Sequence, residues 1–433
     1  MKRTKINALA ERVGEQVLIK GFVHEVRSHS KVKFLLVRDR YGVVQTVTKS
    51  DADFFEEIAK VSKESVVSVT GEVVAAKKAP GGIELRVESY EVLSFAEPQL
   101  PLQVVEKGSS SADLSTRLDW RWLELRKPKK LLVFEIWTFM ERVMREWWAE
   151  NDFIQVYSPK LMGTPSESGA ELFGIEYFGQ QAYLAQSPQF YKQMAMAAGF
   201  EKIFEIGPVF RANPSHTSRH DTEFTMIDME VSYVESAEDI MQVEEEWLAY
   251  LLGRVKEEYG EQVQEVFGVE VVVPQTPFPR ITFSEAIARL ADEKGHSLEG
   301  DLDSAGEKLL FEIIREEFGH EFVFVTDYPW SIRPFYHMKK GSAETKSFDL
   351  LWKGLEITTG AQREHRPDVL KEQAVEKGLH LDILEDYLNF FRYGCPPHGG
   401  FALSPTRMLM LLLGIKNVRE VTFLPRDTHR LTP

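Results

Sequence analysis

Three arginine-bearing segments contain the residue types that a phosphate-binding site needs. In residues 204–232 (FEIGPVFRANPSHTSRHDTEFTMIDMEVS), Arg211 leaves an apolar run, and the polar loop after it ends at Arg219 and His220. A guanidinium binds phosphate or carboxylate through two parallel hydrogen bonds. The chain has neither G-x-x-x-x-G-K-S/T nor G-x-G-x-x-G, so side chains would have to hold the phosphate. Taken alone, this segment is better explained as a hairpin with a surface salt bridge.

The second segment, residues 347–366 (SFDLLWKGLEITTGAQREHR), carries candidate metal ligands. Asp349 and Glu356 lie in an extended apolar run, and Thr359 follows three residues after Glu356. Mg²⁺ is commonly bound by one or two carboxylates together with substrate phosphates. The spacing predicts such a site, and a strand pair with a charged edge is the alternative.

The third segment, residues 399–427 (GGFALSPTRMLMLLLGIKNVREVTFLPRD), predicts a strand entered through two glycines and then a helix. Arg407 falls in the first turn of that helix. An anion can bind at a helix N-terminus, and an arginine there adds positive charge. The alternative is an ordinary amphipathic helix.

The elements that position these segments fall into two groups, which together predict an α+β protein. Near the N-terminus, β-branched runs separated by turn signals predict five strands, with a helix over 51–63 after the third. This order predicts an OB-type barrel, a frequent oligonucleotide-binding scaffold. The strands are expected at 17–25, 34–38, 43–48, 66–74 and 83–93.

Beyond the barrel, residues 97–108 carry two prolines and look like a linker. Long helices are expected at about 128–151 and 236–260, with strands and helices alternating to the C-terminus.

Composition narrows the classes of protein. The 433 residues carry a net charge of −15, but residues 1–50 hold 11 Lys and Arg against 4 Asp and Glu, a net +7. A basic segment on an acidic body predicts a small polyanion-binding module, with a chance solvated face as the alternative. The single Cys395 excludes an internal disulfide and a cysteine-rich zinc site. The N-terminus has no apolar core and the longest apolar runs are short, so we expect a cytoplasmic protein without a membrane partner.

In order along the chain, these segments resemble class II aminoacyl-tRNA synthetases, closest to the aspartyl/asparaginyl subgroup and its archaeal-type aspartyl members. Residues 204–232 resemble the second motif and 399–427 the third. The resemblance implies an OB-fold anticodon-binding domain over 1–104, a hinge over 105–128, and a catalytic domain over 129–433. That domain would have a central antiparallel sheet flanked by helices. Further matching segments are 151–161, which resembles the first motif and contains Pro159, 166–173 (SESGAELF), 183–193 (YLAQSPQFYKQ) and 423–433.

The resemblance implies an aspartate–tRNA ligase that uses ATP and Mg²⁺ to form aspartyl-adenylate. Arg211 would contact the α-phosphate and the amino-acid carboxylate, and Phe224 would stack under adenine. His220 and Arg407 would bind the terminal phosphates, so catalysis would rest on positioning and charge neutralisation. The implied ATP site comprises Arg211, Asn213, Arg219, His220, Phe224, Glu356 and Arg407, and the implied metal ligands are Asp349, Glu356 and Thr359.

The amino acid implied by the resemblance is L-aspartate. Lys192 and Arg363 match the cations that face the side-chain carboxylate, and Asp228 matches the aspartyl form of the second motif. Two cations favour a carboxylate over an amide. The implied amino-acid site comprises Glu167, Gln189, Lys192, Asp228, Thr359, Gly360 and Arg363.

The resemblance also implies contacts with tRNA. Phe34 and Gln45 would stack on and hydrogen-bond the central anticodon base, with Arg27 beside them. His24 and Pro80 resemble the relaxed type, which charges both tRNA(Asp) and tRNA(Asn). A homodimer built on the first motif and a functional link to a tRNA-dependent amidotransferase are implied as well.

Two departures from the family pattern keep other functions open. Asn213 stands where the second motif normally has glutamate, and residues 402–407 (ALSPTR) replace Gly-x-Gly-x-Glu-Arg. New side chains could crowd the nucleotide, and Pro405 lacks a backbone donor. The alternatives are a paralogue that activates aspartate for a small-molecule acceptor, and a non-catalytic tRNA-binding paralogue.

Overall fold

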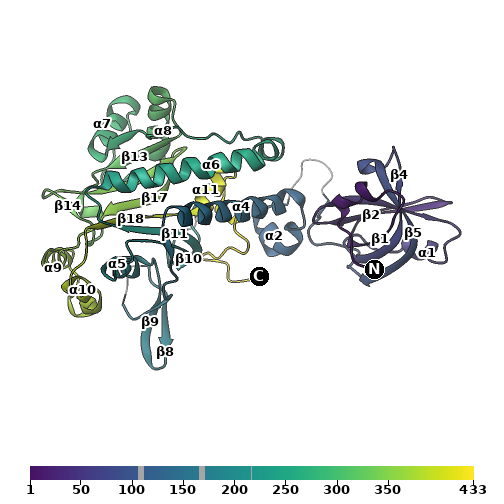
Figure 1. Cartoon of the computed structure of the whole chain (residues 1–433), viewed down its shortest axis with the longest axis horizontal. Helices are drawn as coiled ribbons and strands as arrows, with labels where there is room; N and C mark the ends of the chain where they lie inside the picture. Colours follow the sequence, from purple (N-terminus) through teal and green to yellow (C-terminus); the bar gives the residue numbers. More distant parts are fainter. Residues whose placement is uncertain (106–111, 165–170, 216) are drawn as a thin grey trace. The chain divides into compact units, whose positions relative to one another are not determined.

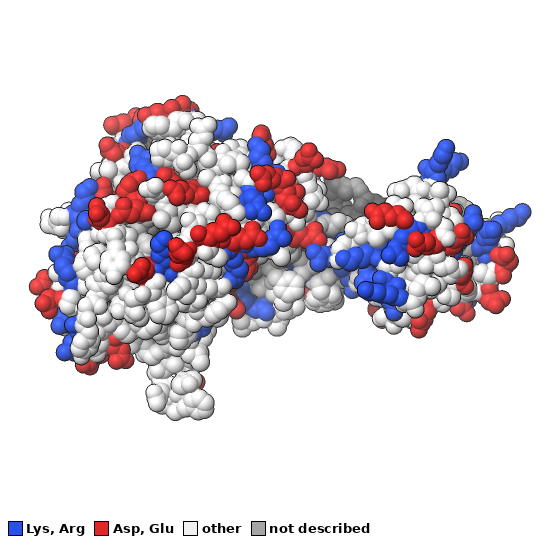
Figure 2. All heavy atoms as spheres, viewed as in Figure 1, with Lys and Arg blue, Asp and Glu red and all other residues white. Residues whose placement is uncertain are grey.

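The computed structural model describes residues 1–105, 112–164, 171–215 and 217–433, which divide into two compact units, 1–131 and 132–433 (Figure 1). Within the described part, no helix is long and apolar enough to cross a membrane. Acidic and basic side chains are interspersed over much of the visible face of both units (Figure 2).

Unit 1 contains a closed barrel in the order β1-β2-β3-β5-β4, which confirms the predicted OB-type fold. Alternate residues of β4 are buried, as the period of two in a strand requires, and valines fill the interior. The strands are β1 (Gln16–Ser28), β2 (Val32–Asp39), β3 (Gly42–Lys49), β4 (Val66–Ala75) and β5 (Ile83–Ser94).

The helix after the third strand is much shorter than the predicted span 51–63. Only Phe55–Ile58 forms α1, and both of its end residues are buried. Neither Asp51 nor Asp53 caps it; Phe54 precedes the helix without a side-chain cap. The chain then turns at Glu64, which adopts a left-handed φ of 66°, to enter β4. Two short helices, α2 (Leu114–Asp119) and α3 (Arg121–Glu124), complete the unit's described elements together with the 3-10 turns at Ile6–Ala8, Ala10–Arg12 and Pro80–Gly82.

Unit 2 is built on an eight-stranded sheet in the order β12-β13-β16-β17-β18-β11-β10-β6. The six central strands are antiparallel, as expected, whereas the edge strands β12 and β6 pair in parallel with their neighbours. The strands are β6 (Ile154–Gln155), β10 (Lys202–Phe210), β11 (Glu223–Ser232), β12 (Arg280–Thr282), β13 (Phe322–Thr326), β16 (Ser347–Trp352), β17 (Leu355–Gln362) and β18 (His398–Leu403).

The two faces of this sheet differ in chemistry. Side chains such as Ile227 and Met229 join an apolar cluster with α4 (Pro128–Glu150), α6 (Ala237–Phe267) and α11 (Pro405–Leu412). Their neighbours on β11, Asp228 and Glu230, point to the opposite face because side chains alternate along a strand. The predicted helix over 128–151 is confirmed, and the one over 236–260 continues seven residues further, to the left-handed Gly268.

The remaining described elements surround the sheet. A capping box starts both α6 and α7, and glycine ends α6, α7 and α8. The remaining helices are α5 (Gln189–Ala197), α7 (Phe283–Lys294), α8 (Ser304–Phe318), α9 (Pro367–Glu376) and α10 (Glu385–Arg392). Two small sheets are formed by β7 (Leu161–Met162), β9 (Gln180–Leu184) and β8 (Gly174–Tyr177), in that order, and by β14 (Lys339–Lys340) with β15 (Glu344–Thr345).

Candidate active site

A cavity of about 770 Å³ lies on the polar face of the unit 2 sheet. This volume is in the range of small-molecule sites. Most of the predicted ATP and amino-acid residues line it: Gln189, Arg211, Asn213, Arg219, His220, Phe224, Asp228, Glu356, Thr359, Arg363 and Arg407. Lys192, Asp349 and Gly360 are not among its lining residues, and Glu167 lies outside the described part of the chain.

One row of opposed side chains runs across the polar face of the sheet, and its middle members, Asp228, Ala402 and Thr359, line the cavity. Strand register places Glu205 opposite Asp228, Asp228 opposite Ala402, Ala402 opposite Thr359, and Thr359 opposite Asp349. Directly opposed residues of antiparallel strands share a face. The row therefore brings residues that are up to 197 positions apart in sequence to one surface, and it includes Glu205, which the sequence analysis did not single out.

Arg211 follows the last residue of β10 and enters the cavity. Its guanidinium carbon lies 5.6 Å from the ring centroid of Phe224, and its Nε donates to the Gln186 carbonyl at 3.4 Å. Arg407 lies in the first turn of α11. Its Nη1 donates to the backbone carbonyl of Glu356 at 2.9 Å and lies 3.4 Å from the side-chain carboxylate of the same residue. The two arginines and the aromatic ring thus occupy one cavity, as predicted.

His220 is neutral at pH 7. Burial, and then the charges of Arg407 and Arg219, lower its pKa to about 4. The Thr217 hydroxyl lies 2.6 Å from its Nδ1. A neutral imidazole can donate one hydrogen bond to a phosphate but supplies no charge to it.

Arg219 has a partner that sequence reasoning missed. Its Nη1 donates to both oxygens of Glu307 on α8, at 3.0 and 2.8 Å. Burial raises the pKa of Glu307 to about 7, although Arg219 acts in the opposite direction. A phosphate that binds Arg219 must therefore compete with this carboxylate.

The predicted metal ligands fit Mg²⁺ in part. Arg333 donates to Asp349 Oδ2 at 2.6 Å, while Oδ1 is buried and has no hydrogen-bond partner. Thr359 donates to Glu356 Oε1 at 3.3 Å. Among the described residues, no three His, Cys, Asp or Glu side chains converge on a metal site. An ion held by Asp349 and Glu356 would need oxygens from a bound phosphate, which suits Mg²⁺.

These two carboxylates differ in how readily they ionise. Burial raises the pKa of Asp349 to about 6, against the effect of Arg333. Burial acts the same way on Glu356, but Arg407 and Arg333 outweigh it and lower the pKa of Glu356. Glu356 is therefore the more firmly ionised of the pair.

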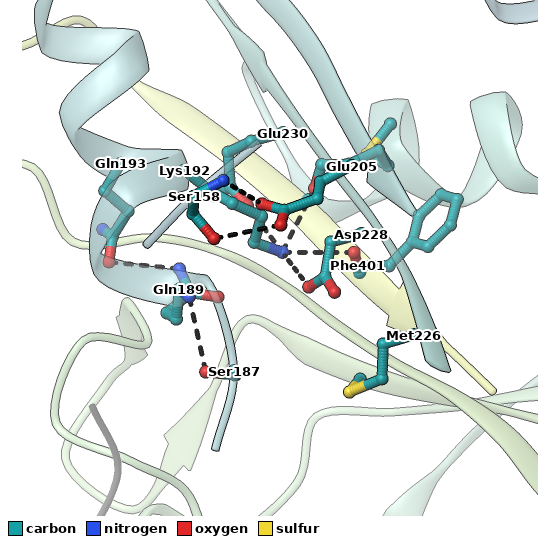
Figure 3. A network of polar contacts seen from close by, with 12 residues as sticks. Ser158, Ser187, Gln189, Lys192, Gln193, Glu205, Met226, Asp228, Glu230 and Phe401 are labelled. Carbon is teal, nitrogen blue, oxygen red and sulfur yellow. Dashed lines mark hydrogen bonds and ion pairs between the residues drawn. The ribbon is translucent and has the colours of Figure 1, made fainter. Parts of the chain in front are cut away.

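The predicted aspartate-binding cations are already paired with carboxylates, as Figure 3 shows for Lys192. Lys192 Nζ lies 3.0 Å from Asp228 and 3.3 Å from Glu230, and it donates to two backbone carbonyls. Arg363 Nε donates to Glu230 at 3.0 Å, and its Nη1 lies 2.9 Å from His337 Nε2. Arg363 lines the cavity, whereas the structure places Lys192, whose side chain is 1% exposed, among the carboxylates outside the lining.

Gly360 has a packing role. A Cβ at this position would lie 2.2 Å from a ring atom of Phe348, so no larger residue fits. Sequence reasoning missed several lining residues because nothing in their local pattern marks them. They are Glu171, Gln186, Ser187, Met226, Tyr336 and His337. Of these, Glu171 falls inside the segment 166–173, Gln186 and Ser187 inside 183–193 and Met226 inside 204–232, although none was singled out by itself.

The departures from the family pattern are accommodated locally. Pro405 is the first residue of α11, a position that needs no N–H, and Ser404 caps the helix by accepting from Arg407 N. The side-chain oxygens of Thr406 and Ser404 lie 3.1 Å apart. Asn213 Oδ1 accepts from Ser215 N at 2.7 Å, so its amide N–H₂ remains available to the cavity. Because the first residue of a helix needs no backbone N–H, the lack of that donor at Pro405 does not destabilise α11.

On the barrel, Arg27 of β1 lies opposite Phe34 of β2, and Gln45 of β3 lies opposite Leu36 of β2. Leu36 is two residues after Phe34, so the two point to the same face of the strand. Arg27, Phe34 and Gln45 therefore share the outer face. Gln45 donates to Glu84 at 3.2 Å. His24 sits at a bulge of β1 and Pro80 is exposed.

Comparisons with known proteins match both units. Residues 113–428 match the family "tRNA synthetases class II (D, K and N)", and residues 17–93 match "OB-fold nucleic acid binding domain". An aspartate–tRNA(Asp/Asn) ligase of Methanopyrus kandleri is 46% identical over 428 residues, covering 98% of this chain and 97% of the relative. An aspartate–tRNA(Asp) ligase of Pyrococcus abyssi is 42% identical, covering 97% of each.

Among solved structures, asparaginyl-tRNA synthetase of Pyrococcus horikoshii with asparaginyl-adenylate matches with a TM-score of 0.91 and 33% identity over the whole of both chains. These matches extend over the barrel, the sheet and the cavity described above. The chain belongs to the class II tRNA synthetases of the D, K and N group.

Proposed function

We propose that this protein is an aspartate–tRNA ligase. It joins L-aspartate to ATP, releasing pyrophosphate, and then transfers the aspartyl group to tRNA. The observation that carries the proposal is the placement of Arg363 in the same cavity as Arg211 and Arg407. An amino acid with a side-chain carboxylate and a nucleotide with phosphates both find a guanidinium there.

The first step is an attack of the aspartate α-carboxylate oxygen on the α-phosphorus. The new P–O bond forms as the bond to the β-phosphate breaks, and pyrophosphate leaves. Arg211 neutralises charge at the α-phosphate and Arg407 at the leaving group. When bound, Mg²⁺ would neutralise further phosphate charge, and Asp349 and Glu356 would hold it.

Aspartate-dependent ATP–pyrophosphate exchange tests this proposal, with asparagine as the matched control. Asparagine would leave Arg363 without a charged partner in the ligand, so we expect a preference for aspartate on the order of 10³-fold in kcat/KM. Equal exchange with both amino acids would contradict the assignment of aspartate. Exchange without any transfer to tRNA would favour a small-molecule acceptor instead, the function that the substitutions at 213 and 402–406 leave open.

We also propose that the enzyme charges both tRNA(Asp) and tRNA(Asn). Arg38 Nη1 lies 3.0 Å from His24 Nδ1, and Glu64 holds the same guanidinium at 2.8 Å. Burial and Arg38 lower the pKa of His24, so its Nδ1 accepts from Arg38 and its Nε2 carries the proton. One N–H donor suits either pyrimidine at the third anticodon position, and Pro80 offers no side-chain donor to discriminate between them.

Aspartylation of the two purified transcripts at one stated salt concentration tests tRNA choice. We expect values of kcat/KM within about tenfold, or roughly 1.4 kcal/mol. Pro80→Lys should favour tRNA(Asp) by adding a long cationic donor. A parent preference above about a hundredfold would contradict relaxed charging while leaving the ligase assignment intact. Aspartyl-tRNA(Asn) would need an amide-transferring enzyme to become asparaginyl-tRNA, which is the functional link that we propose.

We further propose a homodimer. Several apolar side chains in the segment that resembles the first motif are exposed: Ile154 by 50%, Tyr157 by 76% and Leu161 by 48%. Clustered exposed apolar residues favour an interface. Sedimentation equilibrium should give twice the chain mass of 49.7 kDa, and Tyr157→Glu should shift the protein toward monomer.

A further inference from the structure

Two buried carboxylates lie directly opposite each other on β10 and β11. Glu205 and Asp228 are register partners, and they are 2% and 1% exposed. Like charges at opposed positions of a strand pair repel each other, and burial strengthens the repulsion. Each carboxylate therefore needs its own cation.

The structure supplies those cations from opposite sides. Lys160 Nζ donates to Glu205 Oε1 at 2.6 Å, and Lys192 Nζ lies 3.0 Å from Asp228 Oδ1. Glu205 is also bonded to Ser158, which donates its backbone N–H at 3.2 Å and its hydroxyl at 3.0 Å (Figure 3). Lys160 donates to the same Ser158 hydroxyl at 2.9 Å. Both carboxylate oxygens of Glu205 therefore have hydrogen-bond partners other than Asp228.

Gly207 leaves room for the Glu205–Lys160 ion pair. Gly207 lies two residues after Glu205 on the same face of β10, and a Cβ there would lie 3.0 Å from Glu205 Oε1 and 3.6 Å from Lys160 Nζ. Asp228, by contrast, lines the cavity, and neither of its oxygens has a hydrogen-bond partner apart from the ion pair with Lys192.

We infer that Lys160 and Glu205 are positioning residues for the amino-acid substrate. Lys160 neutralises Glu205, which would otherwise repel Asp228 across the strand pair, and so keeps Asp228 aligned with Lys192. The inference rests on the proposed function, because it assigns Asp228 to the amino-acid end of the cavity. Neither Lys160 nor Glu205 touches the substrate, and both act through Asp228.

Without the Lys160 charge, the Glu205 carboxylate would oppose ionisation of Asp228 and draw Lys192 towards β10. Both changes alter the amino-acid end of the cavity, while Arg211 and Arg407 keep their own partners. The ATP end should therefore be unaffected.

The test is a charge-compensation series measured by ATP–pyrophosphate exchange. Lys160→Met should raise the KM for aspartate by about tenfold or more, the effect of shifting one buried carboxylate by a pKa unit, and should leave the KM for ATP within about twofold. Lys160→Arg keeps the charge and should restore the parent KM. Lys160→Met combined with Glu205→Gln removes both charges and should return the KM to within about threefold of the parent.

A matched control is Lys353→Met, because Lys353 forms an ion pair of 3.4 Å with Glu321 outside the cavity and is 23% exposed against 21% for Lys160. Its KM for aspartate should not change. An unchanged KM in Lys160→Met, or a double variant as impaired as the single one, would overturn the inference.

Thermal unfolding provides a second readout that does not need activity. The Tm should fall in Lys160→Met and recover in the double variant, since the unpaired carboxylate is then gone. A double variant that unfolds at the temperature of Lys160→Met or below would contradict the charge pairing. A parent without aspartate-dependent exchange would contradict the proposed function, and the unfolding series would still decide whether Lys160 balances Glu205.

Discussion

Arg407 shows how one side chain can serve two purposes at the phosphate end of the cavity. It holds the Glu356 carbonyl at 2.9 Å and faces the carboxylate of the same residue. In the proposed reaction Arg407 would neutralise the leaving phosphate, and its charge also lowers the pKa of Glu356.

Arg407→Ala should lower ATP–pyrophosphate exchange by about a hundredfold or more, because it removes a cation from the leaving group. Arg392→Ala, in the last turn of α10, is the control and should keep parent activity. If Arg407→Ala retains near-parent exchange, ATP does not bind along α11 as proposed.

Glu244 is a buried residue whose charge state should affect stability. It lies on α6 and is 0% exposed, and neither of its side-chain oxygens has a hydrogen-bond partner in the described part of the chain. Burial raises its pKa to about 8 from an ordinary value near 4.5. Between those pH values the folded protein holds a proton that the unfolded chain releases, so stability falls as pH rises.

Glu244→Gln should therefore stabilise the protein at pH 8.5 by roughly 2–4 kcal/mol relative to the parent. The difference should shrink as pH falls towards 4.5, where both forms are neutral. Melting temperatures of parent and variant at pH 5 and pH 8.5 measure this. A pH-independent difference would show that packing, and not the charge, distinguishes them.

At the scale of elements, α8 restrains the loop between β10 and β11. Glu307 on α8 holds Arg219 through two hydrogen bonds, although the two residues are 88 positions apart. Because burial raises the pKa of Glu307 to about 7, this restraint strengthens as pH rises through neutrality.

Glu307→Gln should release Arg219 and lower the KM for ATP by about threefold to tenfold at pH 8, with a smaller effect at pH 6. Steady-state exchange kinetics at the two pH values provide the measurement. An unchanged KM at pH 8 would indicate that Arg219 does not bind phosphate.

The elements also show what the sequence could predict. All five barrel strands and the strand-loop-strand of 204–232 followed from alternation and turn residues, because those signals are local. The helix over 51–63 was wrong in length: residues 51–54 and 59–60 form turns and bends, and only Phe55–Ile58 is helical. Glu205, Glu307 and Arg333 were missed because their roles depend on partners 16 to 88 residues away.

For the whole molecule, charge is divided unevenly along the chain. Unit 1, residues 1–131, carries 23 Lys and Arg against 18 Asp and Glu, a net +5, whereas residues 132–433 sum to −20, so we expect unit 1 to attract a polyanion that the rest repels. Raising NaCl from about 50 to 200 mM should increase the KM for tRNA by roughly tenfold or more. Exchange without tRNA should change by less than about twofold, because the cavity contacts are short and partly buried. An equal loss in both assays would contradict this division of roles.

The distribution of aromatic side chains has a spectroscopic consequence. All eight tryptophans lie at residue 120 or later, so strands β1–β5 contain none. Trp120 and Trp122 are 37% and 49% exposed, whereas Trp148 and Trp247 are fully buried beneath the unit 2 sheet. Emission from the buried indoles should lie at shorter wavelengths and resist acrylamide quenching. An oligonucleotide that contacts only the barrel strands should therefore leave tryptophan emission unchanged, and any change in the blue-shifted emission would report on the sheet that carries the cavity.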